Sequence, residues 1–436
     1  MNLSSFPAGW RVARLGFLVE THVPQRDKPH PLNGPIPWVR IEDFDGQEIR
    51  ASKSGQGVTA AQVASMNLRV LRPGTVLCSC SCSMGATAIV REPLVSNQTF
   101  IGLSPGPEVE SRFLFYLMHA MQDSMQALAT GAIQQYLSRD DFRALRVPLP
   151  PLSEQGRIAD FLDSETARID RLIDLRRLQL LRLEERVYAS VSEILVPGIL
   201  GPRQSCGPWP WLPAMPGDRP LVRLGYVCRL QNGLTVDSKR DLSGDVVTRP
   251  YLRVANVQAG HVDLDSVVEI TVPREIAHRT SLRPGDVLMT EGGDLDKLGR
   301  GAVWRGELSG CLHQNHVFAL RPETDRLDGD YLALMTSTLH GRCYFESTGS
   351  KTTNLASTNS SKIMSFPIPL PSVATQRALA TEAQTMIDSS QSAKRLLAHQ
   401  LGLLAERRQA LITAAVTGQF DVPTASGGNV TEGITA

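Results

Sequence analysis

The chain has 436 residues, of which 42% are hydrophobic and 20% are charged, and its formal net charge is +1. This length exceeds what one hydrophobic core supports, so we expect two or three domains of ordinary globular composition. The near-zero charge neither indicates nor excludes a nucleic-acid binder, because local basic patches bind phosphate. No apolar signal core opens the chain and no run approaches about 18 apolar residues, so we expect a cytoplasmic protein without membrane contact.

Residues 1–150 are expected to form a first α+β lobe. Segments 36–44 and 71–90 favour strands broken by Pro-Gly turns, whereas segment 111–130 changes to a helical period. Cys78, Cys80 and Cys82 alternate with serine, which places the three thiols on one face of a strand. No second ligand pair at metal-binding spacing accompanies them, so we expect free cysteines that pack as small hydrophobic groups.

Residues 151–196 are predicted to form one long helix. Pro150 and Pro151 precede it, Ser153 and Glu154 suit its first turn, and Pro197 ends it. At about 1.5 Å per residue this helix is roughly 60 Å long. Seven of ten seam positions are apolar, which predicts one partner helix along the whole length. The a positions are Thr166, Ile173, Leu180, Val187 and Ile194, and the d positions are Leu162, Ile169, Arg176, Leu183 and Ser190.

The second half of the chain repeats the first. Arg-Leu-Gly occurs at 14–16 and 223–225, Leu-Arg-Pro-Gly occurs within 70–79 and 281–290, and the proline-rich junction at 146–159 resembles that at 366–380. Residues 314–318 echo residues 96–100 in the same way. Seven such landmarks recur in one order at an offset of roughly 210–220 residues, which chance does not produce.

The repeat predicts the order lobe, helix, lobe, helix. Residues 197–220, with seven Pro and four Gly, are expected to be a linker, 221–370 a second lobe, 371–419 a second long helix and 420–436 a disordered tail. The two helices are expected to pack antiparallel as an intramolecular coiled coil with pseudo-twofold symmetry. The facing stripe comprises Leu379, Ile387, Leu397, Leu401, Leu404, Leu411 and Ala415, interrupted by Ser390, Lys394 and Arg408.

The motifs of common enzymes are missing from the sequence. Segment 349–352 resembles the end of a phosphate loop but lacks its Gly-Lys contact, and no adenine methyltransferase motif or S-adenosylmethionine loop occurs. His313 and His316 have no histidine counterparts in the first lobe, and the acidic residues Glu42, Asp43 and Asp45 have none in the second. We therefore expect no catalysis and no metal site.

What the lobes share is polar loops with changed side chains. Residues 134–136 are matched to 352–354, Arg40 to Arg253 and Gln98 to His316, and loop 83–87 is replaced by the longer loop 292–300. Amides, hydroxyls and arginines are the groups that recognise base edges in the major groove, although they are also ordinary loop residues. The candidate DNA contacts are Arg40, Gln98, Gln134, Gln135, Tyr136, Arg253, Asn256, Lys297, Arg300, His316, Lys351, Thr352 and Asn354.

A repeated lobe that ends in a PLPPLSEQ-type junction, followed by a long helix that ends like AERRQALITAAVTG, resembles the specificity subunit of type I restriction-modification systems. The second junction departs from the pattern, because Ala374-Thr375-Gln376 stands where the first has Ser153-Glu154-Gln155. The resemblance implies a non-catalytic subunit whose two target-recognition domains recognise the halves of a bipartite asymmetric DNA site.

The resemblance also implies partners. The paired helices would act as a ruler and dock two copies of an adenine methyltransferase subunit, and restriction subunits are a further possible partner. The cofactors S-adenosylmethionine, Mg²⁺ and ATP would belong to those partners, with none in this chain. The alternative, from another class, is a protein-binding two-lobed scaffold with the coiled coil as its assembly rod. Salt-dependent binding to duplex DNA distinguishes the two, since phosphate contacts release counterions.

Overall fold

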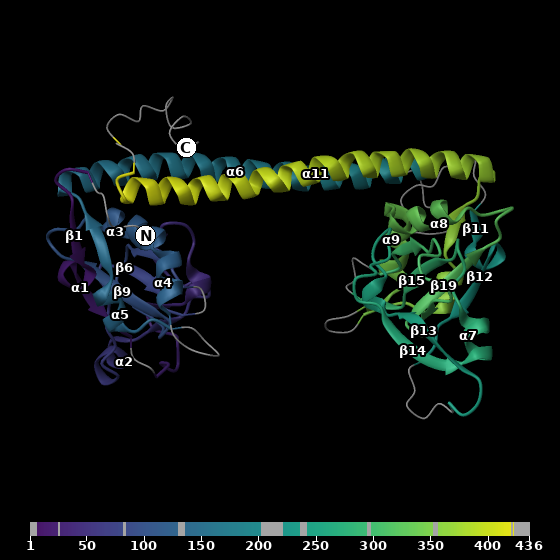
Figure 1. Ribbon diagram of the computed structural model, residues 1–436, viewed down its shortest axis with the longest axis horizontal. Coiled ribbons are helices and arrows are strands. Elements are labelled where there is room, and N and C mark those ends of the chain that lie inside the picture. The colour runs from purple at the N-terminus through teal and green to yellow at the C-terminus, as the bar shows by residue number, and fades with distance from the viewer. Residues whose placement is uncertain are drawn as a thin grey trace. The chain divides into compact units, whose positions relative to one another are not determined.

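A computed structural model describes residues 7–24, 27–81, 84–129, 136–201, 221–235, 242–293, 298–351, 356–419 and 422 (Figure 1). Its residues form two compact units: Met1–Arg177 with His399–Ala436, and Leu178–Ala398. Each unit holds one α+β lobe and a part of each of two long helices. Most of the predicted linker 197–220, and the tail 420–436 except residue 422, lie outside the described residues.

The lobe of the first unit is built on a five-stranded sheet in the order β2-β9-β6-β7-β4, beside a three-stranded sheet β5-β3-β8 and the pair β1-β10. Every residue of β6 and β7 is buried, and helix α3 packs on β6, β7 and β9. The strands are β1 Arg11–Arg14, β2 Val19–His22, β3 Ile36–Val39, β4 Glu48–Ile49, β5 Gly57–Val58, β6 Val76–Ser79, β7 Thr87–Val90, β8 Val95–Ser96, β9 Phe100–Pro105 and β10 Arg146–Leu149. The short helices are α1 Leu15–Leu18, η1 Ile41–Asp43, α2 Ala60–Ser65, α3 Ser111–Ala120, α4 Gln122–Leu128 and α5 Arg139–Ala144.

The helix predicted at 111–130 is two helices, so that prediction is wrong in part. The backbone leaves the helical region at Met121, with φ −86° and ψ 3°, and this residue separates α3 from α4. The Glu110 side chain accepts a hydrogen bond from the backbone N–H of Phe113 and thereby caps α3. The spacing of apolar residues did not reveal the break between α3 and α4, because Met121 and Met125 are both buried and continue the apolar face.

The cysteine prediction is confirmed for the two thiols that the structure describes. Cys78 and Cys80 are free and buried, and burial raises the pKa of the Cys80 thiol to about 11. Both therefore stay protonated at neutral pH and serve as packing groups. Cys82 lies outside the described residues.

The lobe of the second unit repeats this framework. Its sheets have the orders β12-β19-β15-β17 and β14-β13-β18, beside the pair β11-β22 and the small sheet β16-β21-β20. Figure 1 shows α8 and α9 between the β12–β19–β15 sheet and the adjoining long helix. The strands are β11 Leu221–Arg223, β12 Cys228–Asn232, β13 Val246–Leu252, β14 Val268–Pro273, β15 Val287–Thr290, β16 Gly292–Gly293, β17 Gly301–Val303, β18 Leu312–His313, β19 Val317–Pro322, β20 Ser350–Lys351, β21 Ala356–Ser357 and β22 Pro367–Pro369. The short helices are η2 Leu224–Tyr226, η3 Val254–Asn256, α7 Arg274–Thr280, α8 Gly329–Ser337, α9 Leu339–Thr348 and α10 Ser360–Met364.

Strand pairing confirms the internal repeat. The antiparallel run β2-β9-β6-β7 corresponds to β12-β19-β15-β17, and β1-β10 corresponds to β11-β22. The parallel pair β3-β8 corresponds to β13-β18, a less common pairing that recurs at the same point of each lobe. The two lobes are therefore variants of one fold.

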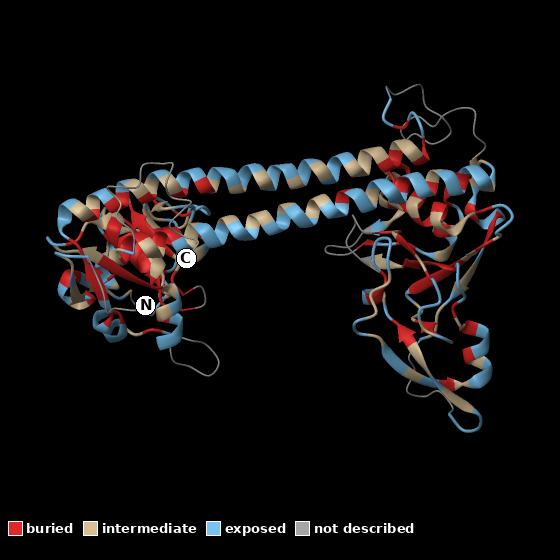
Figure 2. Ribbon diagram, turned by 45° about the horizontal axis from the view of Figure 1, so that its top comes forward, coloured by how far each residue is buried: buried red, intermediate tan, exposed pale blue. Residues whose placement is uncertain are grey.

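The long helices are α6 (Leu152–Leu195) and α11 (Val373–Val416), with 44 residues each. All ten seam positions predicted on α6 are buried or partly buried, and between 171 and 186 only the seam residues are shielded from solvent (Figure 2). No helix among the described residues is long and apolar enough to cross a membrane.

The helices pack antiparallel within each unit, as predicted. In the first unit the early α6 residues Leu162 and Ile169 share a core with Leu411 of late α11. In the second unit the late α6 residue Leu195 shares a core with Ala383 of early α11. Polar seam residues of α11 are neutralised by acids of α6: Arg408 Nε lies 2.9 Å from Asp170 Oδ1, and Lys394 Nζ lies 3.1 Å from Glu184 Oε1.

A fully buried glutamine joins each lobe to its helix. The Gln155 carbonyl accepts from the Glu110 N–H at 2.9 Å, and its amide donates to the carbonyls of Glu108 and Pro150, both at 2.9 Å. Gln376 makes the same three bonds in the second unit, to the Asp328 N–H and the carbonyls of Arg326 and Pro371. The second junction therefore keeps its contact despite the changed residues before it.

Replacing Gln155 by leucine is expected to lower the free energy of unfolding by about 2–4 kcal/mol, because three buried backbone groups lose their partners. Gln391→Leu, on the exposed surface of α11, is the control and is expected to stay within about 0.5 kcal/mol of the unsubstituted chain. Denaturant unfolding measures both. Equal stability of the two variants would rule out the anchoring role of Gln155.

Candidate nucleic-acid interface

The candidate residues of the first lobe lie where strands β3 and β8 end. These strands are parallel, so Arg40 after β3 and Gln98 after β8 lie at the same edge of the sheet. The Asn97 N–H donates to the Val39 carbonyl at 3.0 Å and holds the two segments together. Tyr136 is 43% exposed and pairs with Ser81 through an isolated bridge. Gln134 and Gln135 lie outside the described residues.

Two cations flank a tryptophan at this edge. Lys28 Nζ lies 5.4 Å and the Arg40 guanidinium carbon 6.0 Å from the centre of the Trp38 ring. Arg40 also pairs with Glu42 at 2.8 Å. A small pocket beside them is lined by residues that include His22, Asp27, Lys28, Trp38, Asn97 and Gln98. Lys28 and Trp38 were not among the predicted contacts, because nothing in the sequence spacing joins a loop lysine to a strand tryptophan.

Asn256 does not belong among the contact residues, and its assignment is corrected. Only 1% of it is exposed, its carbonyl accepts from the Arg253 N–H at 2.8 Å, and its amide donates to the Asp263 carbonyl at 2.9 Å. Asp43 accepts from the Arg40 N–H at 2.7 Å in the first lobe. Asn256 and Asp43 are therefore equivalent turn-forming residues, while the arginines beside them are more exposed.

Two of the loop equivalences predicted from the sequence are wrong. Ser79 pairs with Phe100 in the first lobe and Thr290 with Val317 in the second, so His316 corresponds to Thr99, and Gln98 to Asn315. Tyr136 bridges Ser81 as Ser357 bridges Gly292, so Tyr136 corresponds to Ser357. Because the loops differ in length, the predicted alignment of the two lobes is off by one residue at Gln98 and by three at Tyr136. The pattern of side chains alone does not reveal such shifts.

The second lobe presents a different set of side chains at the matching edge. His316 Nδ1 lies 2.5 Å from Glu291 Oε2, and both residues are partly exposed. Arg253 extends from the turn that Asn256 forms and donates to the Ser266 carbonyl. Arg300 precedes β17, and Lys351 ends β20. Lys297, Thr352 and Asn354 lie outside the described residues.

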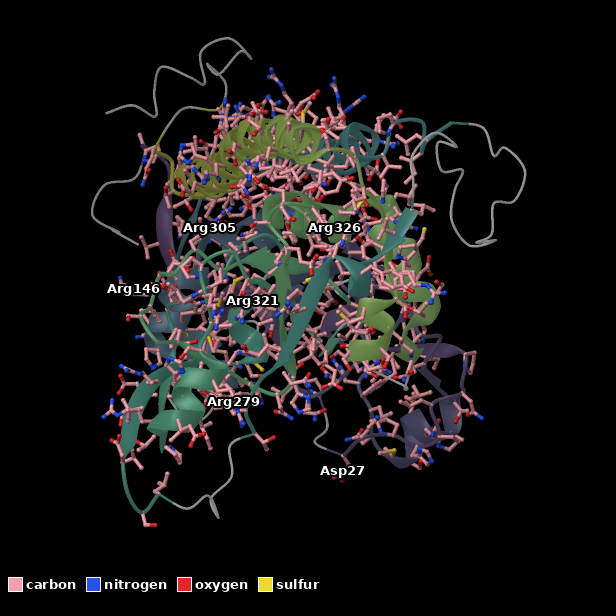
Figure 3. All side chains as sticks on the ribbon, turned by 90° about the vertical axis from the view of Figure 1, so that its right-hand side faces the viewer. Asp27, Arg146, Arg279, Arg305, Arg321 and Arg326 are labelled. Atoms are coloured by element: carbon pink, nitrogen blue, oxygen red, sulfur yellow. The ribbon has the colours of Figure 1, made fainter. Side chains whose placement is uncertain are left out.

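The lobes also differ beneath this edge. In the first lobe, Ser104 Oγ lies within hydrogen-bond distance of His22 Nε2 and Thr75 Oγ1, and burial lowers the pKa of His22. The matching positions of the second lobe hold an ion pair, in which Arg321 donates to both oxygens of the buried Asp286 at 2.7 and 2.8 Å. Figure 3 shows Arg321 within the strands of this lobe, with Arg279 at its edge.

Among the described residues, no group of three or more His, Cys, Asp or Glu side chains is arranged to hold a metal ion. The arrangement is instead one of arginine, lysine, histidine, amide and aromatic groups on loops held by a rigid sheet. Such groups bind phosphates and base edges.

Comparison with known proteins agrees with this chemistry. Residues 7–182 match the family described as the type I restriction modification DNA specificity domain. Over 184 residues, 41% of this chain, it is 26% identical to the type I restriction enzyme MjaIX specificity subunit of Methanocaldococcus jannaschii. Over 307 residues, 69% of this chain, it is 24% identical to the EcoKI specificity subunit of Escherichia coli K12. These matches span 42% and 63% of the two relatives, less than two thirds of either.

Solved structures share the fold. A chain from a study of complex assembly and conformational transition of the type I R-M system aligns with a TM-score of 0.71 and 21% identity, covering 95% of this chain and all of that one. The HsdS subunit of Thermoanaerobacter tengcongensis aligns with a TM-score of 0.50 and 20% identity, covering 95% and 98%.

Residues 7–182 thus match a type I restriction modification DNA specificity domain, and the chain shares its fold with the two solved structures. The resemblance to the specificity subunits of type I restriction-modification systems is thereby confirmed.

Replacing Asn256 by alanine is expected to lower the free energy of unfolding by about 1–3 kcal/mol, because the Arg253 N–H and the Asp263 carbonyl lose their partner. The exposed Gln258→Ala variant is the control for the same loop, with an expected change under about 0.5 kcal/mol. Denaturant unfolding distinguishes them. An Asn256→Ala variant of normal stability would return this residue to the list of candidate contacts.

Proposed function

We propose that the chain is the DNA-recognition subunit of a type I restriction-modification assembly and that its two lobes recognise the halves of a bipartite asymmetric site. The observation that carries this proposal is one framework, present twice, with different side chains at the same edge. Two copies of one scaffold can bind two DNA half-sites in the same way, and different side chains on them can recognise different base sequences.

The candidate contacts have the required chemistry. Arginine binds guanine through O6 and N7, a contact worth about 1–3 kcal/mol of discrimination. Arg40 and Arg253 stand on the same turn of the two lobes, so each is assigned to one half-site. Gln98, Tyr136, Arg300, His316 and Lys351 are proposed as further contacts, together with Gln134, Gln135, Lys297, Thr352 and Asn354.

The long helices are proposed to dock two copies of an adenine methyltransferase subunit, and an endonuclease subunit joins where the system has one. Their surfaces support protein binding, because several leucines outside the seam are about half exposed. In the first unit, a groove is lined by Leu172 and Leu403 with Arg176 and Arg407 at its sides. The exposed leucines of the two helices are Leu152, Leu172, Leu175, Leu178, Leu181, Leu396 and Leu403.

Catalysis is assigned to those partners. S-adenosylmethionine, Mg²⁺ and ATP would be bound by them, and this chain would supply the sequence specificity. Methyl transfer by the isolated chain would contradict this assignment.

Methylome sequencing of a host that carries the complete system tests the recognition function. We expect one interrupted sequence to be methylated. Arg40→Ala is expected to relax one half-site and Arg253→Ala the other, each by roughly 10- to 100-fold in discrimination. Arg50→Ala, which removes a partner of Glu48, is the control and should leave both half-sites intact. If the unsubstituted system methylates no interrupted site, the proposal fails.

Inserting seven residues into both α6 and α11 tests whether the helices set the spacing. A heptad adds about 10 Å and keeps the seam in phase, so the spacer is expected to lengthen by roughly three base pairs. Both half-sites should keep their sequence. The same seven residues appended after residue 436 are the control, and an unchanged spacer in the first variant would exclude the ruler.

A further inference from the structure

Each lobe exposes one large aromatic side chain at the same place in its fold. Phe17 is 82% exposed and Tyr226 is 68% exposed. Both end a copy of the sequence Arg-Leu-Gly-aromatic, at 14–17 and 223–226. One exposed aromatic side chain is ordinary on a protein surface. Its recurrence at the same position of a divergent repeat indicates a shared use.

The framework holds both aromatics outward in the same way. Leu15 and Leu224 are fully buried, and their N–H groups donate to the carbonyls of Leu145 and Phe366 at 2.8 and 2.9 Å. The following glycine lies close to another segment in each case. A Cβ on Gly16 would lie 2.8 Å from the Arg143 side chain, and one on Gly225 would lie 3.2 Å from the Met364 carbonyl. The turn is therefore anchored, while its aromatic is left in solvent.

Each aromatic lies at the opposite end of its sheet from one candidate DNA contact, Gln98 in the first lobe and His316 in the second. Val19, next to Phe17, pairs with Pro105, whereas Gln98 lies beyond the other end of β9. Cys228, near Tyr226, pairs with Pro322, whereas His316 lies beyond the other end of β19. Strands of four to six residues separate the two ends by about 13–20 Å. A base-reading role for the aromatics is therefore disfavoured.

Arginines lie near the aromatic in both lobes. Arg14 pairs across the β1–β10 ladder with Arg146, and Arg143 packs beside Gly16. Within the described chain, no carboxylate lies at ion-pair distance from these three arginines. In the second lobe, Arg223 occupies the position of Arg14. Arg326, labelled in Figure 3, donates to the Tyr226 carbonyl at 2.8 Å and also pairs with Glu323 at 3.3 Å, so the excess positive charge is larger in the first lobe.

We infer that these two aromatic–arginine patches, Phe17 with Arg14, Arg143 and Arg146 and Tyr226 with Arg223 and Arg326, are docking sites for an acidic surface of the methyltransferase subunit, one copy at each lobe. Aromatic and arginine side chains dominate the binding energy of protein interfaces. The twofold occurrence matches two copies of one partner, and the positive charge selects an acidic surface. This inference rests on the proposed function and adds a lobe contact to the docking on the helices.

The test measures binding of the purified methyltransferase subunit of the same system to the full chain, by titration calorimetry for affinity and native mass spectrometry for stoichiometry. Phe17→Ala is expected to weaken one of two binding events by roughly 10- to 100-fold, and Tyr226→Ala the other. The double variant is expected to weaken both. Leu128→Ala and Leu242→Ala, which remove other exposed apolar side chains of the two lobes, are the controls and should bind normally.

Arg143→Ser and Arg146→Ser together are expected to reduce the salt dependence of methyltransferase binding, because they remove two charges from the first patch. Thermal unfolding checks that each variant stays folded, as exposed positions should allow. Unchanged affinity of the double aromatic variant overturns the inference and leaves the proposed function standing. A loss of DNA affinity with normal methyltransferase binding also overturns it. Failure of the unsubstituted chain to bind the methyltransferase rejects the proposed function itself, and the inference with it.

Discussion

The buried amide of a glutamine fixes the point at which each lobe meets its long helix. Gln155 and Gln376 each satisfy one N–H and two carbonyls that the first helical turn and the lobe would otherwise bury without partners. Because an unsatisfied buried polar group is costly, neither the loop before α3 or α8 nor the proline-rich junction can move independently of the helix. The direction of each lobe relative to the adjoining helical segment follows from these bonds.

The two lobes keep the same framework but differ in other side chains. The turns, the strand pairing and the junctions recur in both lobes. For example, the Asp43 carboxylate and the Asn256 amide accept equivalent hydrogen bonds that hold the same turn. The buried polar centre has changed as a set, from Thr75, Ser104 and His22 to Asp286, Arg321 and Gln231. Introducing Asp286 or Arg321 alone would leave its charge without a partner, so this pair changes together between the two lobes.

The elements with long or repeated sequence patterns could be predicted from the sequence. The α6 seam followed from its heptads, and the two lobes followed from landmarks in one order, because strand and helix periods survive substitution. The break at Met121 was missed since apolar residues continue across it. The loop equivalents of His316 and Tyr136 were missed because a changed loop length moves every later residue, and only strand pairing fixes the register. The cations at Trp38 come from separate segments and carry no joint signal.

The polar residues that interrupt the α11 stripe have a role that an apolar seam cannot supply. A stripe of leucines tolerates sliding by a heptad, whereas Arg408 and Lys394 each face a carboxylate of α6. Two heptads separate Asp170 from Glu184 and Lys394 from Arg408, so a single antiparallel register satisfies both pairs. A slip by one heptad would place Lys394 opposite Val191 or Arg177, and Arg408 opposite Arg177 or Asp163, so neither direction keeps both ion pairs. Arg408 and Lys394 thus bury less apolar surface at the seam than leucines would, but they define the register of the two helices. A helix pair that is to set a distance needs a defined register.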